Sequence, residues 1–349
     1  MTETHRQWRL LGARRIELAE IKIPEPAPHQ ALLRIERATT CGTDLKAYQA
    51  GGHARMLKPP CPFGHELVGV LERRGAAFGD RMEIGQRVVV SNSSPCRACR
   101  NCRLGRENLC RDQRYVNGAF ADYLLLDERF ERSLHPCPPG LLAEHACLAE
   151  PLACALHCME AVAPTLRRFS ARDQARAIVM GAGPLGLLLV ALMEEAGVEV
   201  VSVDPNPDRL RAAVEVGARE TVVYQRVLDD LNEHWERYDL AIDASGTLQG
   251  WRNAIASVAP GGEAVLFGGI PGGGDLPIDA HRVHYDEVTI RGLYHHRPEL
   301  FPQALSWLER RSDVGSLLVA ETLPLEELPF ALNQMEQRRA FKVALDPNL

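Results

Sequence analysis

The sequence lacks the features of membrane, secreted and nucleic-acid-binding proteins. None of its apolar runs approaches the roughly 20 residues that a membrane-spanning helix requires. The first residues, MTETHRQWRLLGARR, carry charges where a secretory signal needs an uninterrupted apolar stretch. Positive charge is not in surplus either, since 40 Lys and Arg against 46 Asp and Glu give a net charge of −6 and no broad basic surface. We therefore expect a cytoplasmic protein that binds a small molecule, and neither a membrane nor nucleic acid.

The length and the cysteine count narrow the class further. At 349 residues the chain is about twice the size of a usual domain, which predicts two domains with separate cores. Ten cysteines would indicate disulfides in a short secreted protein. In a long chain without a secretory signal they more often indicate metal binding or catalysis, and their spacing must decide.

Three stretches of different character follow one another along the chain. Gly and Pro divide the first, up to about residue 135, into short β-like runs such as ALLRIERA and QRVVVS. From about residue 174 apolar β-like runs alternate with helical patterns, which predicts a parallel sheet covered on both faces. The tail is too short to form a domain. We expect an α/β protein with a mainly β domain at 1–155, a doubly wound domain at 156–294, and a segment at 295–349 that completes the first domain.

A glycine-rich turn marks the start of the doubly wound region. Gly181, Gly183 and Gly186 form G-x-G-x-x-G directly after the apolar run AIVM and directly before a helical pattern. In that context the glycines allow a tight turn, a close approach of the backbone to a pyrophosphate, and close packing of helix on strand. Pro184 and Leu185 complete the turn and are further candidate cofactor contacts. Glycine-rich turns that bind no nucleotide are also common.

An acidic residue strengthens the nucleotide-binding interpretation. Asp204 ends the next strand-like run, VEVVSVD, 18 residues beyond Gly186, where a carboxylate would accept hydrogen bonds from ribose hydroxyls. The same carboxylate would repel a 2′-phosphate, which favours NAD over NADP, although Arg209 could partly offset this. The alternative role for Asp204 is that of a cap or turn residue before Pro205.

Four cysteines form a dense cluster in a lobe at about 91–112. Cys96, Cys99, Cys102 and Cys110 give C-x-x-C-x-x-C-x7-C within SPCRACRNCRLGRENLC. Gaps of two residues let thiolates converge on a tetrahedral zinc ion, and the arginines between them leave little apolar core for buried free thiols. An iron–sulfur cluster is the rival interpretation, because related spacings hold such clusters. A four-thiolate zinc site leaves no open coordination position, so its role would be structural.

A second set of ligand-type residues is dispersed along the chain. Cys41 opens C-G-T-D, His65 and Glu66 lie in G-H-E, and Glu150 precedes Pro151 just before the dinucleotide region. Taken singly, a lone cysteine is usually a core residue, and a His beside a Glu at a strand edge is more often structural. A zinc ion held by one thiolate, one imidazole and one or two carboxylates would keep a position for substrate oxygen and act as a Lewis acid.

Together these motifs resemble those of the zinc-containing medium-chain dehydrogenases over nearly the whole chain. C-G-T-D, G-H-E, the four-cysteine lobe, E-P-L-A and G-A-G-P-L-G occur in the family's order. C-G-T-D and E-P-L-A-C-A-L-H are closer to polyol (sorbitol-like) and threonine dehydrogenases than to ethanol-type enzymes, which carry a cysteine ligand where this chain has Glu150. The resemblance implies a GroES-like catalytic domain and a Rossmann domain that binds NAD(H).

The resemblance also implies roles for single residues. A catalytic zinc ion would be held by Cys41 and His65, with Glu66 and Glu150 as direct or water-mediated partners. Thr43 is placed by family analogy to accept the alcohol proton. Asp44 would hydrogen-bond the second nitrogen of the histidine ligand and hold its tautomer, and His157 is either a relay residue or a structural histidine on a helix.

The other cysteines and a histidine pair carry weaker signals. No ligand spacing connects the five remaining cysteines, which we interpret as core or incidental: Cys61, Cys137, Cys147, Cys154 and Cys158. His295, His296 and Arg297 follow the last strand-like run of the doubly wound region. They are either substrate contacts or a polar crossover loop.

The sequence thus predicts an enzyme with two zinc ions per chain and NAD(H), acting on a secondary hydroxyl of a polyol, sugar or aminocyclitol. A threonine-type amino-alcohol dehydrogenase is the first alternative, since C-G-T-D is shared with that branch. A non-catalytic NAD-binding sensor is the second, although no ligand or relay hydroxyl is missing. Zinc-free quinone or enone reduction conflicts with both metal sets. We expect a homodimer or homotetramer, because the edge run VTIRGLYH needs cover.

Overall fold

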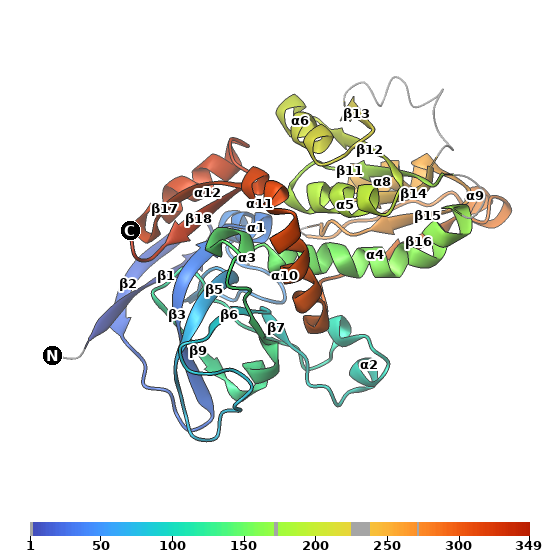
Figure 1. Ribbon diagram of the computed structural model, residues 1–349. Helices are drawn as coiled ribbons and strands as arrows, with labels where there is room; N and C mark the ends of the chain where they lie inside the picture. Colours follow the sequence, from blue (N-terminus) through green and yellow to red (C-terminus); the bar gives the residue numbers. More distant parts are fainter. Residues whose placement is uncertain (1–2, 171–173, 225–237, 271) are drawn as a thin grey trace. The chain divides into compact units, whose positions relative to one another are not determined.

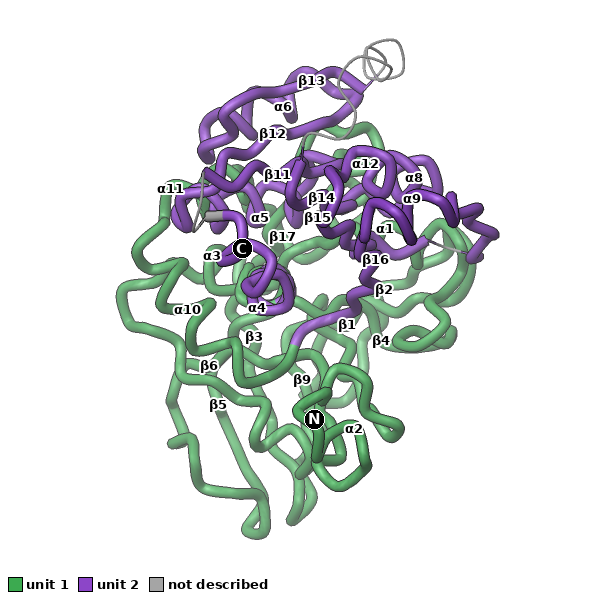
Figure 2. The backbone as a smooth tube through the Cα atoms, turned by 90° about the vertical axis from the view of Figure 1, so that its right-hand side faces the viewer, with its two compact units in different colours: residues 1–153, 297–349 green, residues 154–296 purple. Residues whose placement is uncertain are grey.

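The chain folds into two units, each built on sheets of its own. A computed structural model describes residues 3–170, 174–224, 238–270 and 272–349. Unit 1 comprises residues 1–153 and 297–349, and unit 2 comprises residues 154–296 (Figure 2). The expected domain boundaries were after 155 and after 294. Helix α4 (Ala149–Ser170) runs through the first division, so the polypeptide passes from one unit to the other without a loop.

Unit 1 contains a large mixed sheet with strand order β10-β6-β5-β3-β18-β17, and β9 pairs with β3 as well. The strands of this sheet are β3 (Gln30–Thr39), β5 (Glu66–Arg74), β6 (Arg87–Val90), β9 (Tyr123–Asp127), β10 (Leu134–Pro136), β17 (Val319–Pro324) and β18 (Lys342–Asp346). Strand β18 is antiparallel to β3, with Ala344 opposite Thr39. The C-terminal residues therefore complete a sheet whose other strands were formed some 200 residues or more earlier in the chain.

Shorter elements surround that sheet in unit 1 (Figure 1). A three-stranded sheet has the order β2-β1-β4, and β7 pairs with β8. The strands concerned are β1 (Thr4–Gly12), β2 (Arg15–Lys22), β4 (Cys61–Pro62), β7 (Ser93–Ser94) and β8 (Arg114–Tyr115). The helices are α1 (Gly42–Ala50), α2 (Arg100–Arg103), α3 (Ala143–Ala146), α10 (Phe301–Arg310), α11 (Ser312–Leu318) and α12 (Leu328–Glu336). Single 3-10 turns are η1 (Glu107–Leu109), η2 (Glu128–Ser133), η3 (Pro298–Leu300) and η4 (Leu325–Glu327).

The core of unit 1 brings together side chains from the two sheets. Phe63 and Phe120 are fully buried and meet edge to face, with ring centroids 5.4 Å apart. Leu33 and Ile35 of β3 and Leu67 of β5 pack into the same cluster. Burying large apolar side chains of this kind contributes about 1.5–3 kcal/mol each, so this cluster holds β3 and β5 firmly in register.

Unit 2 is the doubly wound domain that the alternation of strands and helices predicted. Its six strands have the order β13-β12-β11-β14-β15-β16, and each described pair is parallel. The strands are β11 (Arg176–Met180), β12 (Glu199–Asp204), β13 (Glu220–Val223), β14 (Tyr238–Asp243), β15 (Val258–Leu266) and β16 (Thr289–Gly292). The helices are α5 (Pro184–Glu195), α6 (Pro207–Glu215), α8 (Leu248–Ser257) and α9 (Ala280–Tyr285).

This strand order decides where unit 2 can bind a ligand. The sheet grows from β11 first towards β12 and β13 and then, on the other side, towards β14, β15 and β16. Right-handed crossovers then place the connecting helices on opposite faces. Ligands of such sheets bind beyond the carboxyl ends of the strands where the order reverses, which is between β11 and β14. Among the described residues, no helix is both long and apolar enough to cross a membrane.

Candidate metal centre and cofactor loop

Cys41 lies at the N-terminal end of helix α1. Its backbone is extended (φ −127°, ψ 153°), and its Sγ accepts a hydrogen bond from the Thr43 amide at 3.5 Å. In return, Asp44 Oδ2 accepts a hydrogen bond from the Cys41 amide at 3.1 Å. These two bonds cap the helix from both sides and therefore fix the position of the sulfur atom.

Glu66 begins strand β5, and His65 immediately precedes it beside that thiol. The preceding Gly64 has φ +89°, and a Cβ there would come within 2.7 Å of the Phe120 ring, so only glycine fits. Asp44 Oδ1 lies 2.9 Å from His65 Nδ1, and both side chains are buried. Burial lowers the pKa of His65, but the Asp44 carboxylate outweighs it and leaves that pKa well above its usual range. Because the carboxylate accepts from Nδ1, Nε2 is the nitrogen available to a metal.

The three donor side chains converge. Ligand atoms of Cys41, His65 and Glu66 all lie within 4.8 Å of one another. Among the residues that the structure describes, Glu150 is not part of this trio, although it is buried and electrostatically coupled to His65 and Glu66. Burial raises the pKa of Glu150 to about 7. A partly exposed thiol with a buried imidazole and a buried carboxylate at this separation forms a donor set that fits zinc.

Two residues missed by sequence reasoning hold Glu66. Lys342 Nζ lies 2.6 Å from each oxygen of the Glu66 carboxylate, and Thr39 Oγ1 donates to Oε2 at 2.5 Å. Burial lowers the pKa of Lys342, but the Glu66 carboxylate outweighs it and the pKa is raised. The available signal was a lysine within the otherwise apolar run FKVAL. A buried cation in a strand needs a buried anion, but the sequence does not say which.

The four cysteines of the lobe also converge. The sulfur atoms of Cys96, Cys99, Cys102 and Cys110 lie within 4.8 Å of one another. Cys99 Sγ is 3.5 Å from Cys102 Sγ and 4.0 Å from Cys110 Sγ. Backbone amides donate to the sulfurs, as from Cys96 to Cys110 Sγ at 3.2 Å. Backbone hydrogen bonds from Arg111 and Cys102 lower the pKa of Cys99 to about 6. This closed set of thiolates fits a tetrahedral metal ion with no open position.

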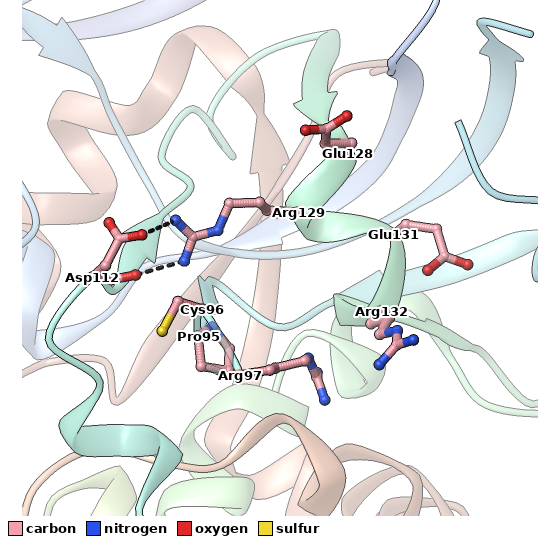
Figure 3. A pocket seen from close by; sticks show the side chains of 8 residues that line it. All are labelled: Pro95, Cys96, Arg97, Asp112, Glu128, Arg129, Glu131 and Arg132. Carbon is pink, nitrogen blue, oxygen red and sulfur yellow. Dashed lines mark hydrogen bonds and ion pairs between the residues drawn. The ribbon is translucent and has the colours of Figure 1, made fainter. Parts of the chain in front are cut away.

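An arginine ties the cysteine lobe to the rest of unit 1. Arg129 donates to Asp112 Oδ2 at 2.7 Å and to the Asp112 carbonyl at 2.5 Å, as Figure 3 shows, and to the Ser94 carbonyl at 3.1 Å. These bonds border a cavity of about 360 Å³. Its lining is Pro95, Cys96, Arg97, Asp112, Glu128, Arg129, Glu131 and Arg132. Three arginines against three carboxylates leave it without net charge, so we interpret it as part of the lobe's attachment.

The glycine turn in unit 2 has the geometry that a dinucleotide needs. Gly181 has φ +102°, and a Cβ there would come within 2.9 Å of the Ser245 amide. A Cβ at Gly186 would overlap the Gly181 carbonyl oxygen. Gly183 caps α5, and Pro184 takes the first helical position. Both are partly exposed, as is Leu185. Backbone amides at this helix start are therefore open to an anion.

Asp204 connects that turn to strand β12. Its Oδ2 accepts from the Ala182 amide at 2.9 Å, and its Oδ1 accepts from the Asn206 amide at 2.8 Å. Asp204 thus makes the contacts expected of a cap or turn residue, which was the alternative role for it. Each carboxylate oxygen still has a lone pair for a ribose hydroxyl. Arg209 lies nearby, with its Nη1 3.9 Å from the position of a Cβ on Gly183.

His157 lies on helix α4 within unit 2 and contacts the histidine pair. Its Nδ1 donates to the His295 carbonyl at 2.7 Å, which leaves Nε2 as an acceptor. His295 has φ +60°, and its ring centroid is 3.9 Å from that of His296. Both rings are buried, so this segment is not an exposed polar loop. Of the five other cysteines, Cys137, Cys147 and Cys158 are buried, and Cys61 and Cys154 are partly exposed.

Two family models match the chain. Residues 27–139 match the alcohol dehydrogenase GroES-like domain, and residues 184–310 match the zinc-binding dehydrogenase model. These ranges fall in the mainly β part of unit 1 and in unit 2 with the start of the C-terminal segment. The predicted fold class, a GroES-like domain with a Rossmann domain, is confirmed.

Relatives match over almost the full length. L-threonine 3-dehydrogenase of Stenotrophomonas maltophilia is 30% identical over 347 residues, which are 97% of this chain and 98% of the relative. L-idonate 5-dehydrogenase of Escherichia coli is 25% identical, with a TM-score of 0.84 over 99% of each chain. A candidate zinc-binding dehydrogenase of Sinorhizobium meliloti, bound to NADP, is also 25% identical, with a TM-score of 0.84 over 99% of this chain and 100% of that one. With both family models and a relative at this identity, the chain belongs to the zinc-dependent medium-chain dehydrogenase family.

Proposed function

We propose that this chain oxidises a secondary alcohol to a ketone with NAD, and catalyses the reverse reduction, at a zinc ion in unit 1. The observation that carries the proposal is the convergence of Cys41 with the buried side chains of His65 and Glu66, with Asp44 holding the histidine. Burial matters here because a charged donor set removed from water interacts strongly with a bound cation. Oxidation of alcohols is the activity of the family; the cofactor, the substrate and the roles below are our proposals.

Each residue of the centre has a definite task. Cys41 and His65 would hold the ion, with Glu66 and Glu150 as the carboxylate partners. When bound, zinc supplies Lewis-acid chemistry that makes an alcohol oxygen easier to deprotonate. Asp44 keeps the proton of His65 on Nδ1, so that Nε2 stays a donor to the ion.

The proton and the hydride leave the substrate separately. The Thr43 hydroxyl would accept the alcohol proton and pass it on towards solvent, because a hydroxyl can accept one hydrogen bond and donate another. When bound, NAD would supply the hydride acceptor, so that alcohol and NAD would give ketone, NADH and one proton. His157, whose Nδ1 donates to the His295 carbonyl, would be a further residue of the relay.

The cofactor would be NAD rather than NADP. The partly exposed glycine turn would bind the pyrophosphate, and the buried carboxylate of Asp204 would bind the adenosine ribose. The NADP found in the Sinorhizobium meliloti protein shows that the fold accepts a 2′-phosphate elsewhere, and Arg209 is the residue that could favour it here. Comparing kcat/KM for the two cofactors tests the assignment, and a preference for NADP would reject it.

The four-cysteine lobe would hold a second zinc ion with a structural role. Local chain geometry brings four sulfurs together, and none of the donors is a carboxylate or imidazole. The iron–sulfur alternative predicts strong visible absorption in the isolated protein. We expect about two zinc ions per chain and a colourless protein.

The substrate class would be a polyol, sugar or aminocyclitol. The L-idonate 5-dehydrogenase neighbour acts on a sugar acid, and Glu150 supplies a polar surface where ethanol-type enzymes carry a thiolate. L-threonine is the second candidate, because the S. maltophilia relative acts on it and matches almost the whole chain.

One screen tests these assignments together. Zinc-loaded protein is incubated with NAD and a panel of polyols, sugar acids, cyclitols and amino alcohols, and NADH formation is followed. Turnover of a polyol or sugar with none on threonine supports the leading substrate class. Turnover of threonine alone would make it the substrate. NADH binding without turnover of any alcohol or ketone would favour a non-catalytic sensor. Cys41→Ser is the control, because activity that survives in it does not come from this centre.

A further inference from the structure

Lys342 is a buried cation whose every donor is in use. Its ammonium lies 2.6 Å from Glu66 Oε1, 2.6 Å from Glu66 Oε2 and 3.1 Å from the Thr40 carbonyl oxygen. An ammonium has three N–H donors, so these three acceptors satisfy it completely. The side chains of Lys342 and Glu66 are 1% and 0% exposed, which leaves no route for water to compete.

The same contacts restrict what Glu66 can offer to a metal. A carboxylate has about four lone-pair positions on its two oxygens. Lys342 uses one on each oxygen, and Thr39 Oγ1 uses the second position on Oε2. One lone pair remains, on Oε1. Glu66 can therefore approach a metal with a single oxygen, and the ammonium beside it offsets its negative charge.

Strand register keeps this arrangement rigid. The Thr40 amide donates to the Val343 carbonyl at 3.0 Å, and the Val343 amide donates to Thr40 Oγ1 at 2.9 Å. Glu66 lies opposite Thr39 on the other edge of β3. The neighbour of Lys342 in the chain is thus bonded to Thr40 at the end of β3, while Glu66 is paired with β3 on its other edge. The two side chains meet from strands on opposite sides of β3.

We propose that Lys342, together with Thr39, is a positioning residue that keeps Glu66 a one-oxygen, weakly donating ligand which a substrate oxygen can displace from the metal. The proposal rests on the proposed function, because it needs a metal at Cys41 and His65. It explains why a centre with a thiolate and two glutamates would still keep an exchangeable position. It also gives the C-terminal strand a direct part in the chemistry of a centre built by residues 41–66.

Cobalt-substituted Lys342→Met protein tests the proposal, with EDTA as the probe of metal release. Without the ammonium, Glu66 regains its full charge and both oxygens, and it should bind the metal more strongly. We expect cobalt release to slow about tenfold. Removing a residue that hydrogen-bonds a metal ligand usually has the opposite effect and weakens metal affinity about 10–100-fold. The visible absorption per cobalt ion should weaken as the coordination number rises, and KM for the alcohol should rise together with a fall in kcat.

Matched variants separate this from a structural role. In a Glu66→Gln background the Lys342→Met change should have no further effect on cobalt release, because Lys342 acts through Glu66. Lys342→Arg keeps the charge and should restore the wild-type rate. Faster release in Lys342→Met, an unchanged spectrum, or an effect that persists in the Glu66→Gln background would overturn the proposal.

Two further measurements keep the test decisive. Lys342→Met leaves a buried carboxylate without its partner and can fail to fold. Thr39→Val removes one uncharged donor to the Glu66 carboxylate, and it should also slow cobalt release, by a smaller factor than Lys342→Met. Faster or unchanged release would overturn the proposal. If wild-type protein shows no cobalt phase that Cys41→Ser abolishes, the metal centre itself is wrong. If that phase is present and Lys342→Met leaves it unchanged, only the role of Lys342 is wrong.

Discussion

The two clusters of metal-ligating side chains in unit 1 are built in opposite ways. The cysteine lobe draws four identical donors from residues 96–110, and each of those cysteines except Cys102 is partly exposed. The other centre combines a thiol, an imidazole and a carboxylate, and its carboxylate is held by Lys342, 276 residues further along the chain. A local, uniform site can close around an ion and stabilise a loop. A dispersed, mixed site depends on the pairing of distant strands. A residue on one strand, such as Lys342, can therefore adjust how strongly a ligand on another strand binds the metal.

Removing the thiolate of the mixed centre gives the largest expected effect. Cys41→Ser should lose one zinc ion per chain and lower kcat/KM by at least about a thousandfold, because Lewis-acid assistance contributes several kcal/mol to the barrier. Elemental analysis and steady-state kinetics check it. Cys61→Ser is the control, since Cys61 belongs to neither cluster. If Cys41→Ser kept its zinc and its activity, the two clusters would not differ as we describe.

Removing a thiolate of the lobe should act on stability instead. Cys99→Ser opens the four-sulfur set, and the loss of a structural metal is among the changes that cost about 4 kcal/mol or more. Urea unfolding of the zinc-loaded proteins measures this cost. The activity per folded molecule should fall far less than in Cys41→Ser. A loss of activity as large as that in Cys41→Ser, at unchanged stability, would erase the contrast.

The same contrast explains which parts could be predicted from sequence. The lobe and the glycine turn are short-range, so C-x-x-C spacing and G-x-G-x-x-G identify them without knowledge of the fold. The link between Lys342 and Glu66 depends on the pairing of β18 with β3, and the bond from His157 to the His295 carbonyl spans 138 residues. Residue types and spacing do not contain strand register, so neither contact could be derived. The sequence left His295 and His296 as either substrate contacts or a polar crossover loop, and it did not indicate that their rings are buried.

A change next to the mixed centre should have an intermediate effect. Asp44→Asn keeps the shape of the side chain but removes the charge that holds His65 Nδ1 at 2.9 Å. We expect metal affinity or kcat/KM to fall about 10–100-fold, as is usual for such outer partners. Asp208→Asn makes the same change at an exposed position in the first turn of helix α6 and serves as the control. Equal behaviour of the two variants would mean that Asp44 is only a helix cap.

The smallest expected effect is a dependence of folding stability on pH, caused by a histidine that belongs to neither cluster. His135 on β10 is 5% exposed and stacks on Phe301 with ring centroids 5.0 Å apart. Burial, helped by Arg81 and by Arg97 of the lobe, lowers the pKa of His135 to about 4. The unfolded chain, with an ordinary histidine pKa near 6.5, binds more protons than the native state between these values. The neutral ring therefore contributes stability that is complete above pH 6.5 and is lost as the pH falls towards 4.

The size of this effect follows from the two pKa values and is about 1 kcal/mol at pH 5.5. Urea unfolding between pH 5 and 7.5 should show His135→Gln losing less stability than wild type as the pH falls. His284→Gln replaces an exposed histidine of unit 2 and should follow the wild-type curve. Parallel curves for wild type and His135→Gln would mean that the native protein protonates His135 without cost. In that case water would reach His135 as it reaches the partly exposed sulfur atoms of the lobe. Only the buried imidazole and carboxylate of the mixed centre would then be shielded from solvent.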